Sequence, residues 1–274
     1  MPALSAWQRL FAERVSARPL ALCRIGLGLA SLLRAYPGHA MLRAVLDGSV
    51  VRAKELVWLP DPPLEWAWVL TATWMLASVT FAAGFLTRTS GVVLTASLFY
   101  RLLLDRNLYA SNLYLMAVLA LLLTVADSGA CASLDNRLWR RPERDAARWS
   151  TVLVRMQISL VYLFSGLSKL NPRFLAGEAF QHTRLAGLAP EMLIVLAVAT
   201  VALELILPWA LWVTRLRRWA VSSAVLFHLA IVVCMERLFM VTMIGFGTMM
   251  VMTFSLYWED GGPLGRARGP VRPI

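Results

Sequence analysis

A polar stripe runs along one apolar stretch of the chain, residues 150–170, and contains side chains that can act as acids, bases or hydrogen-bonding groups. At helical spacing it carries Arg155, Ser159, Tyr162, Gly166 and Lys169, with Ser165 beside them. Residues three or four positions apart share one face of an α-helix, so these side chains would line a single surface. The glycine would let another helix or a flat ligand approach closely. We therefore expect this helix to border a functional site.

Lys169 carries the strongest chemical signal of the stripe. Of the 27 basic residues, 25 are arginines, and Lys54 is the only other lysine. Lysine readily loses its proton when it is desolvated, whereas arginine does not, so the role of a base would explain this choice. A lysine at the end of a membrane span can also extend toward the lipid headgroups, and this alternative stays open.

Glu204 is a second ionisable residue inside an apolar stretch, residues 190–213. Pro208 cannot donate a helical hydrogen bond, so it leaves the carbonyl of Glu204 free. A broken helix with a carboxylate at this depth is typical of a cavity wall, and a buried ion pair is the alternative. An unpaired carboxylate in the membrane is costly, so we expect Glu204 to contact a basic residue. The candidate partners are Arg155, Arg24 and Arg101.

His228 lies in a third apolar stretch, residues 218–235. It could carry protons or donate a hydrogen bond to a ligand, and an ordinary core histidine is an equal alternative. The sequence has no HxxxH or comparable spacing of metal ligands, so it predicts no metal site. Its three cysteines form no CxxC pair, which disfavours a zinc site or a disulfide framework.

Membrane-spanning helices must position these residues, because the composition departs from that of a soluble domain. Of the 274 residues, 59% are hydrophobic and 16% are charged, and the mean hydropathy is +0.63. Soluble domains are about half apolar and about one quarter charged. The net charge of +11 is typical of a membrane protein with basic cytoplasmic loops. No soluble basic face indicates a nucleic-acid partner.

Eight apolar segments are candidates for membrane spans. They cover residues 19–36, 65–86, 90–104, 108–126, 150–170, 190–213, 218–235 and 238–258. We predict an all-α integral membrane protein, with about eight transmembrane helices in one bundle over residues 19–258. Residues 1–18 are predicted to form an interfacial amphipathic helix, and residues 259–274 a disordered basic tail.

The distribution of basic residues predicts the orientation of the bundle. If the N-terminus lies inside, the inner segments carry 15 basic residues and the outer segments carry 7. Basic residues accumulate on the cytoplasmic side, so both termini are predicted to be cytoplasmic. The same count places Lys169 at the outer end of its span. The preference for arginine indicates a GC-rich bacterial genome, so we expect the bacterial inner membrane.

An ordered set of short motifs resembles a known family. Residues 157–170 read QISLVYLFSGLSKL, after Ser133-Leu134-Asp135 and before Glu204-x3-Pro208 and Phe227-His228. The set resembles the HTTM family, the horizontally transferred transmembrane domain shared with vitamin K-dependent γ-glutamyl carboxylase. The resemblance extends from the first span to about Trp258, and residues 157–170 are its most specific part.

The resemblance implies a reaction and roles for individual residues. In the carboxylase, the matching lysine is regarded as the base that deprotonates a reduced quinone, which implies this role for Lys169. Oxidation of that quinol by O2 drives removal of a γ-proton from glutamate, and CO2 then adds. The implied positioning residues for quinol or oxygen are Tyr162, Asn112 and His228. The implied polar network beneath the cofactor consists of Arg155, Arg24 and Glu204, with Gly166 at the cofactor.

Two departures from the carboxylase modify this expectation. A catalytic histidine near the start of the fourth span is replaced by Asn112, and no large lumenal domain follows the eighth span. A second branch of the family, which resembles bacterial membrane proteins that help mature secreted peptide toxins, fits the chain better. We expect a quinol-dependent membrane enzyme that modifies an exported peptide or lipid. The alternatives are a non-catalytic membrane partner in peptide maturation or export, and a transporter, although no internal repeat supports transport.

Overall fold

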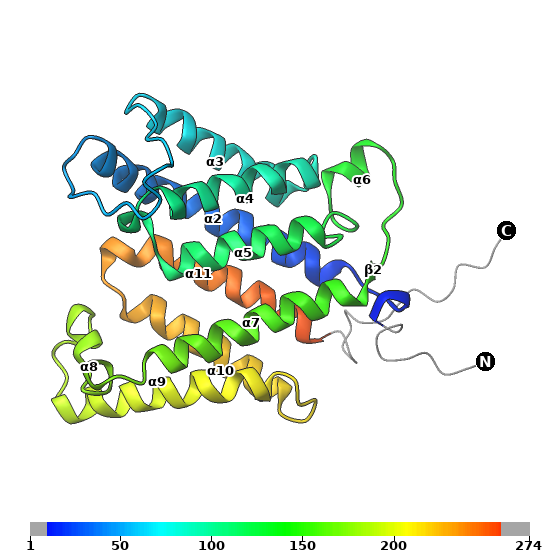
Figure 1. The fold of residues 1–274 in the computed structure, drawn as a ribbon. Coiled ribbons are helices and arrows are strands. Elements are labelled where there is room, and N and C mark those ends of the chain that lie inside the picture. Colours follow the sequence, from blue (N-terminus) through cyan, green and yellow to red (C-terminus); the bar gives the residue numbers. More distant parts are fainter. Residues whose placement is uncertain (1–9, 259–274) are drawn as a thin grey trace.

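Helices form nearly all of the computed structural model, which describes residues 10–258 (Figure 1). Each of the eight predicted apolar segments forms a helix. Their bounds are α2 Arg18–Leu46, α3 Trp66–Ala83, α4 Thr87–Leu104, α5 Ser111–Val125, α7 Arg148–Ser168, α9 Pro190–Ala210, α10 Arg217–Cys234 and α11 Arg237–Thr253. The expected all-α class is therefore confirmed for this part of the chain.

The number of helices that can cross a membrane is smaller than eight by length and composition. Six candidate spans are present among the described residues, and they correspond to α2, α3, α7, α9, α10 and the segment from Phe239 through α11 to Trp258. Helix α5 has only 15 residues, and two arginines lower the hydropathy of α4. The structure thus supports a multi-pass membrane protein, and the expected count of eight spans stays a prediction.

The outer surface of the bundle is apolar over much of its length. Large hydrophobic side chains are exposed on several helices, for example Trp209, Leu226 and Val195, each 65% exposed or more. A soluble monomer rarely exposes apolar surface on this scale, whereas a lipid-facing helix does so by necessity. This surface supports a lipid bilayer as the surroundings of the protein.

Helix α2 lies at the centre of the packing and runs further than its apolar segment predicts. It packs along α3 on one side and α11 on the other, and it continues through Pro37 to Leu46. Proline removes one helical hydrogen bond. Beyond it, Leu42 and Val45 are fully buried against a small cluster that includes Leu104. Burial of this last part explains why the helix passes the proline.

The remaining helices pack around α2 in two groups. Helices α3, α4 and α5 pack in sequence on one side, and α7 packs against α9 on the other. Figure 1 shows α3 and α4 at one edge of the bundle and α9 and α10 at the opposite edge. Helix α5 also contacts α7 and so connects the two groups. This arrangement brings the polar face of α7 against α9 and α10.

Short elements connect these helices. They are β1 Arg14–Val15, η1 Arg106–Leu108, α6 Leu134–Leu138, β2 Ala146–Ala147, α8 Pro172–Leu175, η2 Glu178–His182 and η3 Phe254–Trp258. The two strands pair antiparallel, with Arg14 opposite Ala147. The interfacial helix predicted for residues 1–18 falls largely outside the described residues, and its range includes β1. The predicted disordered tail, residues 259–274, also lies outside them.

Candidate active site

A glycine allows α7 and α9 to approach closely. A Cβ atom at Gly166 would lie 2.9 Å from Leu205 Cδ2 and 3.3 Å from Glu204 Cβ. A Cβ atom here would require the Leu205 side chain to shift, and its contact with Glu204 would be tighter than most real Cβ contacts, so a larger residue would crowd the interface between the two helices. Of the two roles that the sequence left open for this glycine, the structure shows the approach of a helix. That approach positions Glu204 beside the C-terminal end of α7.

Lys169, Ser165 and Glu204 form a closed triangle between α7 and α9. Lys169 Nζ lies 2.6 Å from Glu204 Oε2 and donates to Ser165 Oγ at 2.6 Å. Ser165 Oγ donates in turn to Glu204 Oε1 at 3.1 Å. The side chain of Glu204 is 5% exposed and that of Lys169 is 25% exposed. An amine, a hydroxyl and a carboxylate are thus joined at a partly open position.

This triangle tests two expectations from the sequence. Glu204 does contact a basic residue, as expected, but the partner is Lys169 and not one of the three candidate arginines. The ammonium of Lys169 also points into the helix interface, which is not the geometry of a lysine that extends toward headgroups. Ser165 completes the group; from the sequence it was placed only beside the polar stripe, although its spacing of four residues from Lys169 is one helical turn and could have marked it.

Tyr162 connects α7 to α10 through His228. The Tyr162 hydroxyl lies 2.8 Å from His228 Nε2, and both residues are buried. The imidazole is surrounded by aromatic rings, with Phe246 at 5.6 Å and Phe254 at 6.2 Å between ring centroids. Its second nitrogen, Nδ1, is buried and has no hydrogen-bond partner. Buried polar atoms are rarely left unpaired, so this nitrogen is a candidate contact for a ligand.

Asn112 is the second residue of α5 and carries a similar unpaired atom. Its Oδ1 is buried without a hydrogen-bond partner. Helix α5 begins at the end of the bundle where α7 ends (Figure 1), so Asn112 and Lys169 belong to the same end. Within residues 10–258, however, no hydrogen bond joins Asn112 to the triangle or to Tyr162. The structure thus places Asn112 at the expected level of the bundle without showing direct contact.

Comparison with family models shows where this arrangement belongs. The model of the HTTM domain matches residues 13–260, which is most of the chain. The protein belongs to the HTTM family. The match includes Lys169, Glu204, Tyr162 and His228, so the resemblance read from the motifs is confirmed. A comparison with the solved structures finds no match.

Two arginines expected beneath a cofactor lie elsewhere in this HTTM protein. Arg155 precedes Lys169 by 14 residues, which is about 21 Å along a helix. It donates to the carbonyl of Leu256, and Tyr257 donates back to the carbonyl of Arg155 at 2.9 Å. Arg24 donates to the carbonyls of Ser128 and Ala132, each at 2.6 Å. These arginines therefore hold turns in place, and the structure does not join them to Glu204.

A second buried polar cluster, which the sequence did not predict, lies between α2, α3 and α4. Arg101 donates to Thr71 Oγ1 at 2.8 Å and to the carbonyl of Gly38 at 3.1 Å, and its guanidinium lies 4.6 Å from the ring centroid of Trp74. His39 Nδ1 lies 3.0 Å from the same hydroxyl. Across residues 10–258, His, Cys, Asp and Glu side chains do not gather in groups of three that could hold a metal ion.

Proposed function

We propose that this HTTM protein is a membrane enzyme in which Lys169 removes a proton from a reduced quinone, in order to modify an exported peptide or lipid. The observation that carries the proposal is the position of Lys169 Nζ, 2.6 Å from the Glu204 carboxylate. A lysine acts as a base only after its own proton has a destination, and a carboxylate at hydrogen-bond distance supplies one. The family membership and the matching motif support the same reading.

The residues around Tyr162 fit a quinol by their chemistry. A quinol is a flat ring with hydroxyl groups that both donate and accept hydrogen bonds. His228 Nδ1 and Asn112 Oδ1 are buried polar atoms that lack partners, and Phe246 and Phe254 offer aromatic faces near the imidazole. These residues would hold the ring. When bound, a reduced quinone supplies an acidic hydroxyl group and two electrons.

The protein's own side chains divide the proton handling between them. Glu204 Oε2, 2.6 Å away, would take up the proton that the amine of Lys169 releases, and Lys169 Nζ would then accept the proton of the substrate hydroxyl. Ser165 Oγ contacts both groups and keeps them aligned. With the Tyr162 hydroxyl donating to His228 Nε2, Nδ1 carries the imidazole proton and can donate it to a ligand. This hydrogen bond would stabilise the negatively charged oxygen of the substrate and so lower the barrier for deprotonation of its hydroxyl group.

The test is oxidation of a short-chain reduced naphthoquinone by the purified protein in proteoliposomes under air, followed by absorbance. Lys169→Arg keeps the positive charge but removes a usable base, so oxidation should fall by about 10²–10⁴-fold. The matched control is Lys54→Arg, which changes the other lysine, 3.1 Å from Asp61 in a connecting loop. Its activity should equal that of the wild type.

Two outcomes would overturn the proposal. If Lys169→Arg oxidises the quinol as fast as the wild type, the Lys169–Glu204 pair has only a structural role. If the wild type neither binds nor oxidises the quinol, the alternative of a non-catalytic partner in peptide maturation or export is favoured.

The proposal also includes an orientation, with both termini in the cytoplasm of a bacterium and Lys169 in the outer half of the inner membrane. The count of 15 inner against 7 outer basic residues supports it. Reporter fusions at the C-terminus and after Pro172 should report opposite sides of the membrane. A report from the same side would contradict the orientation.

A further inference from the structure

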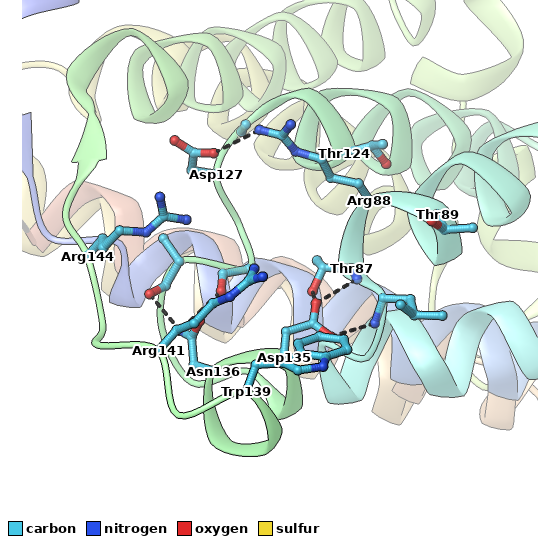
Figure 2. Close-up of a pocket in the computed structure, with 14 residues that line it drawn as sticks. Thr87, Arg88, Thr89, Thr124, Asp127, Asp135, Asn136, Trp139, Arg141 and Arg144 are labelled. Carbon is cyan, nitrogen blue, oxygen red and sulfur yellow. Dashed lines mark hydrogen bonds and ion pairs between the residues drawn. The ribbon is translucent and has the colours of Figure 1, made fainter.

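A cavity of about 520 Å³ lies at the end of the bundle where α4 begins and α5 ends (Figure 2). Its wall includes Thr87 and Arg88 from α4, Asp127 after α5, and Trp139, Arg141 and Arg144 from the loop that follows α6. The volume is within the range of small-molecule sites. Helix α7, with 21 residues, separates this end of the bundle from Lys169 by about 31 Å. The cavity is thus separate from the candidate active site.

Both carboxylates of the cavity are already engaged. Asp135 accepts hydrogen bonds from the backbone nitrogens of Leu86 and Thr87, at 2.7 and 2.9 Å, and from the Thr87 hydroxyl at 2.8 Å. It therefore accepts hydrogen bonds from backbone N–H groups that have no partner within the first turn of α4. Asp127 Oδ1 lies 3.4 Å from Arg88 Nη2, a weak pair on the surface. Figure 2 shows these contacts on opposite sides of the opening.

Two further guanidinium groups line the cavity. Arg141 lies 5.5 Å from the ring centroid of Trp139, and Arg144 is fixed through its backbone nitrogen, which donates to Ala130 at 3.0 Å. Among the described residues, neither arginine forms an ion pair. The cavity therefore has an excess of positive charge, presented by the side chain that best matches a phosphate group.

We propose that this cavity binds a phosphate group, carried by an anionic phospholipid or free in solution. Arg141 and Arg144 provide the charge, and Thr89 and Thr124 line the same space with hydroxyl groups. Trp139 is 46% exposed at the rim, and an exposed tryptophan beside basic residues is typical of the level of the lipid headgroups. The ligand class is thus a phosphate monoanion with room for an attached glycerol.

The experiment measures the thermal unfolding of the full-length protein in detergent with added ligand. The ligands are short-chain phosphatidylglycerol, short-chain phosphatidylcholine and inorganic phosphate, each titrated separately. Anionic lipid should raise the unfolding temperature, and Arg141→Gln/Arg144→Gln should weaken its binding roughly 30-fold, at about fivefold per arginine. The matched control, Arg137→Gln/Arg140→Gln, removes two charges from the same region outside the cavity wall and should bind as the wild type does.

A third variant increases the charge of the cavity without removing an arginine. Asp127→Asn frees Arg88 and should tighten the binding, so loss of folding in the arginine variant would not end the test. A shift with phosphatidylglycerol alone assigns the site to lipid, and a shift with inorganic phosphate alone assigns it to free phosphate. Three outcomes would overturn the proposal. Both arginine pairs could lose ligand binding equally, phosphatidylcholine could shift the unfolding temperature as much as phosphatidylglycerol does, or no ligand could shift it.

Discussion

The N-terminal and C-terminal parts of α7 carry polar residues on the same helical face, but the partners of those residues differ in kind. In the N-terminal part, Arg155 and Ser159 contact backbone carbonyls and the side chains of Tyr257 and Trp212. None of these partners exchanges protons near neutral pH. Such contacts fix η3 and the end of α9 against α7.

The C-terminal part of α7 instead contacts side chains of titratable types. Lys169 contacts Glu204, and Tyr162 contacts His228. His228 Nδ1 and Asn112 Oδ1 have no hydrogen-bond partner and could each form a hydrogen bond with a ligand at this end of the bundle. A continuous polar stripe in a sequence thus contains two functions, one structural and one suited to chemistry, and only the partners distinguish them.

The largest expected effect comes from reversing the Lys169–Glu204 pair. Lys169→Met leaves Glu204 buried without a cation, which should cost about 3 kcal/mol of unfolding free energy. The double variant Lys169→Glu/Glu204→Lys should recover most of this loss in denaturant unfolding but none of the quinol oxidation. Recovery of both would show that the pair acts by charge alone, and recovery of neither would contradict the paired geometry.

Arg24 offers the complementary test on the structural side. Arg24→Met removes three hydrogen bonds from a charged donor to the turn at residues 128–132. Because the buried charge is removed with them, the net loss of stability should be about 2 kcal/mol. Quinol oxidation per folded molecule should stay unchanged, because this turn is remote from Lys169. Arg18→Met, an exposed arginine on the same helix, is the control and should unfold as the wild type does. If quinol oxidation per folded molecule falls together with stability, Arg24 contributes to the candidate active site.

Tyr162→Phe should separate stability from activity in the C-terminal part of α7. Removing the hydroxyl costs one neutral hydrogen bond at 2.8 Å, about 1 kcal/mol of stability. The rate of quinol oxidation should fall more than this change explains, because His228 loses the contact that orients its ring. A rate equal to that of the wild type would remove His228 from the proposed proton handling.

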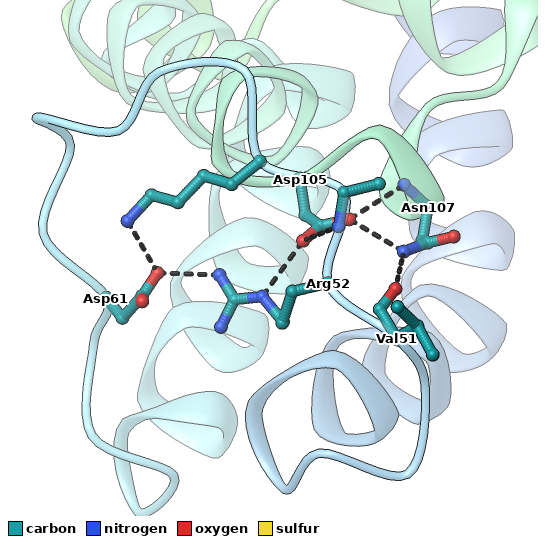
Figure 3. A network of polar contacts seen from close by, with 7 residues as sticks. Val51, Arg52, Asp61, Asp105 and Asn107 are labelled. Carbon is teal, nitrogen blue, oxygen red and sulfur yellow. Dashed lines mark hydrogen bonds and ion pairs between the residues drawn. The ribbon is translucent and has the colours of Figure 1, made fainter.

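The smallest expected effect lies in a loop network beyond the C-terminal ends of α2 and α4, which serves as a structural reference (Figure 3). The buried carboxylate of Asp105 accepts from Arg52 Nε at 2.9 Å and from the backbone nitrogens of Ala53 and Asn107. Burial raises its pKa, but these hydrogen bonds outweigh burial and hold the pKa below its usual value. The Arg52 hydrogen bond also lowers the pKa of Asp61.

These lowered pKa values give the network a defined pH dependence. A carboxyl group with a lowered pKa stabilises the fold above its unfolded pKa of about 3.9, and this contribution is lost as the pH falls through the folded pKa. Hydrogen exchange of residues 47–62 should therefore become faster only below about pH 4. There the free energy of local opening should fall by about 1 kcal/mol. Asp105→Asn should show fast exchange at neutral pH, and an unchanged exchange profile would contradict the network.

Local sequence was enough to predict the helices and to single out Lys169. Apolar runs separated by short loops specify helices in a membrane, and the lysine was distinct because the chain otherwise uses arginine. The helical period also placed Tyr162, Ser165 and Lys169 on neighbouring positions of one surface. These inferences need only local geometry and composition, which are present in any short window of sequence.

The tertiary structure alone decided which residues meet across that surface. Glu204 pairs with Lys169, 35 positions away, because Gly166 lets α9 pack close to α7 at that level. Arg24 likewise meets a turn 104 positions away. Periodicity specifies which face of a helix is polar, but the neighbour on that face depends on the rotation and depth of the packed helices. Those quantities are set by side-chain packing over the whole bundle.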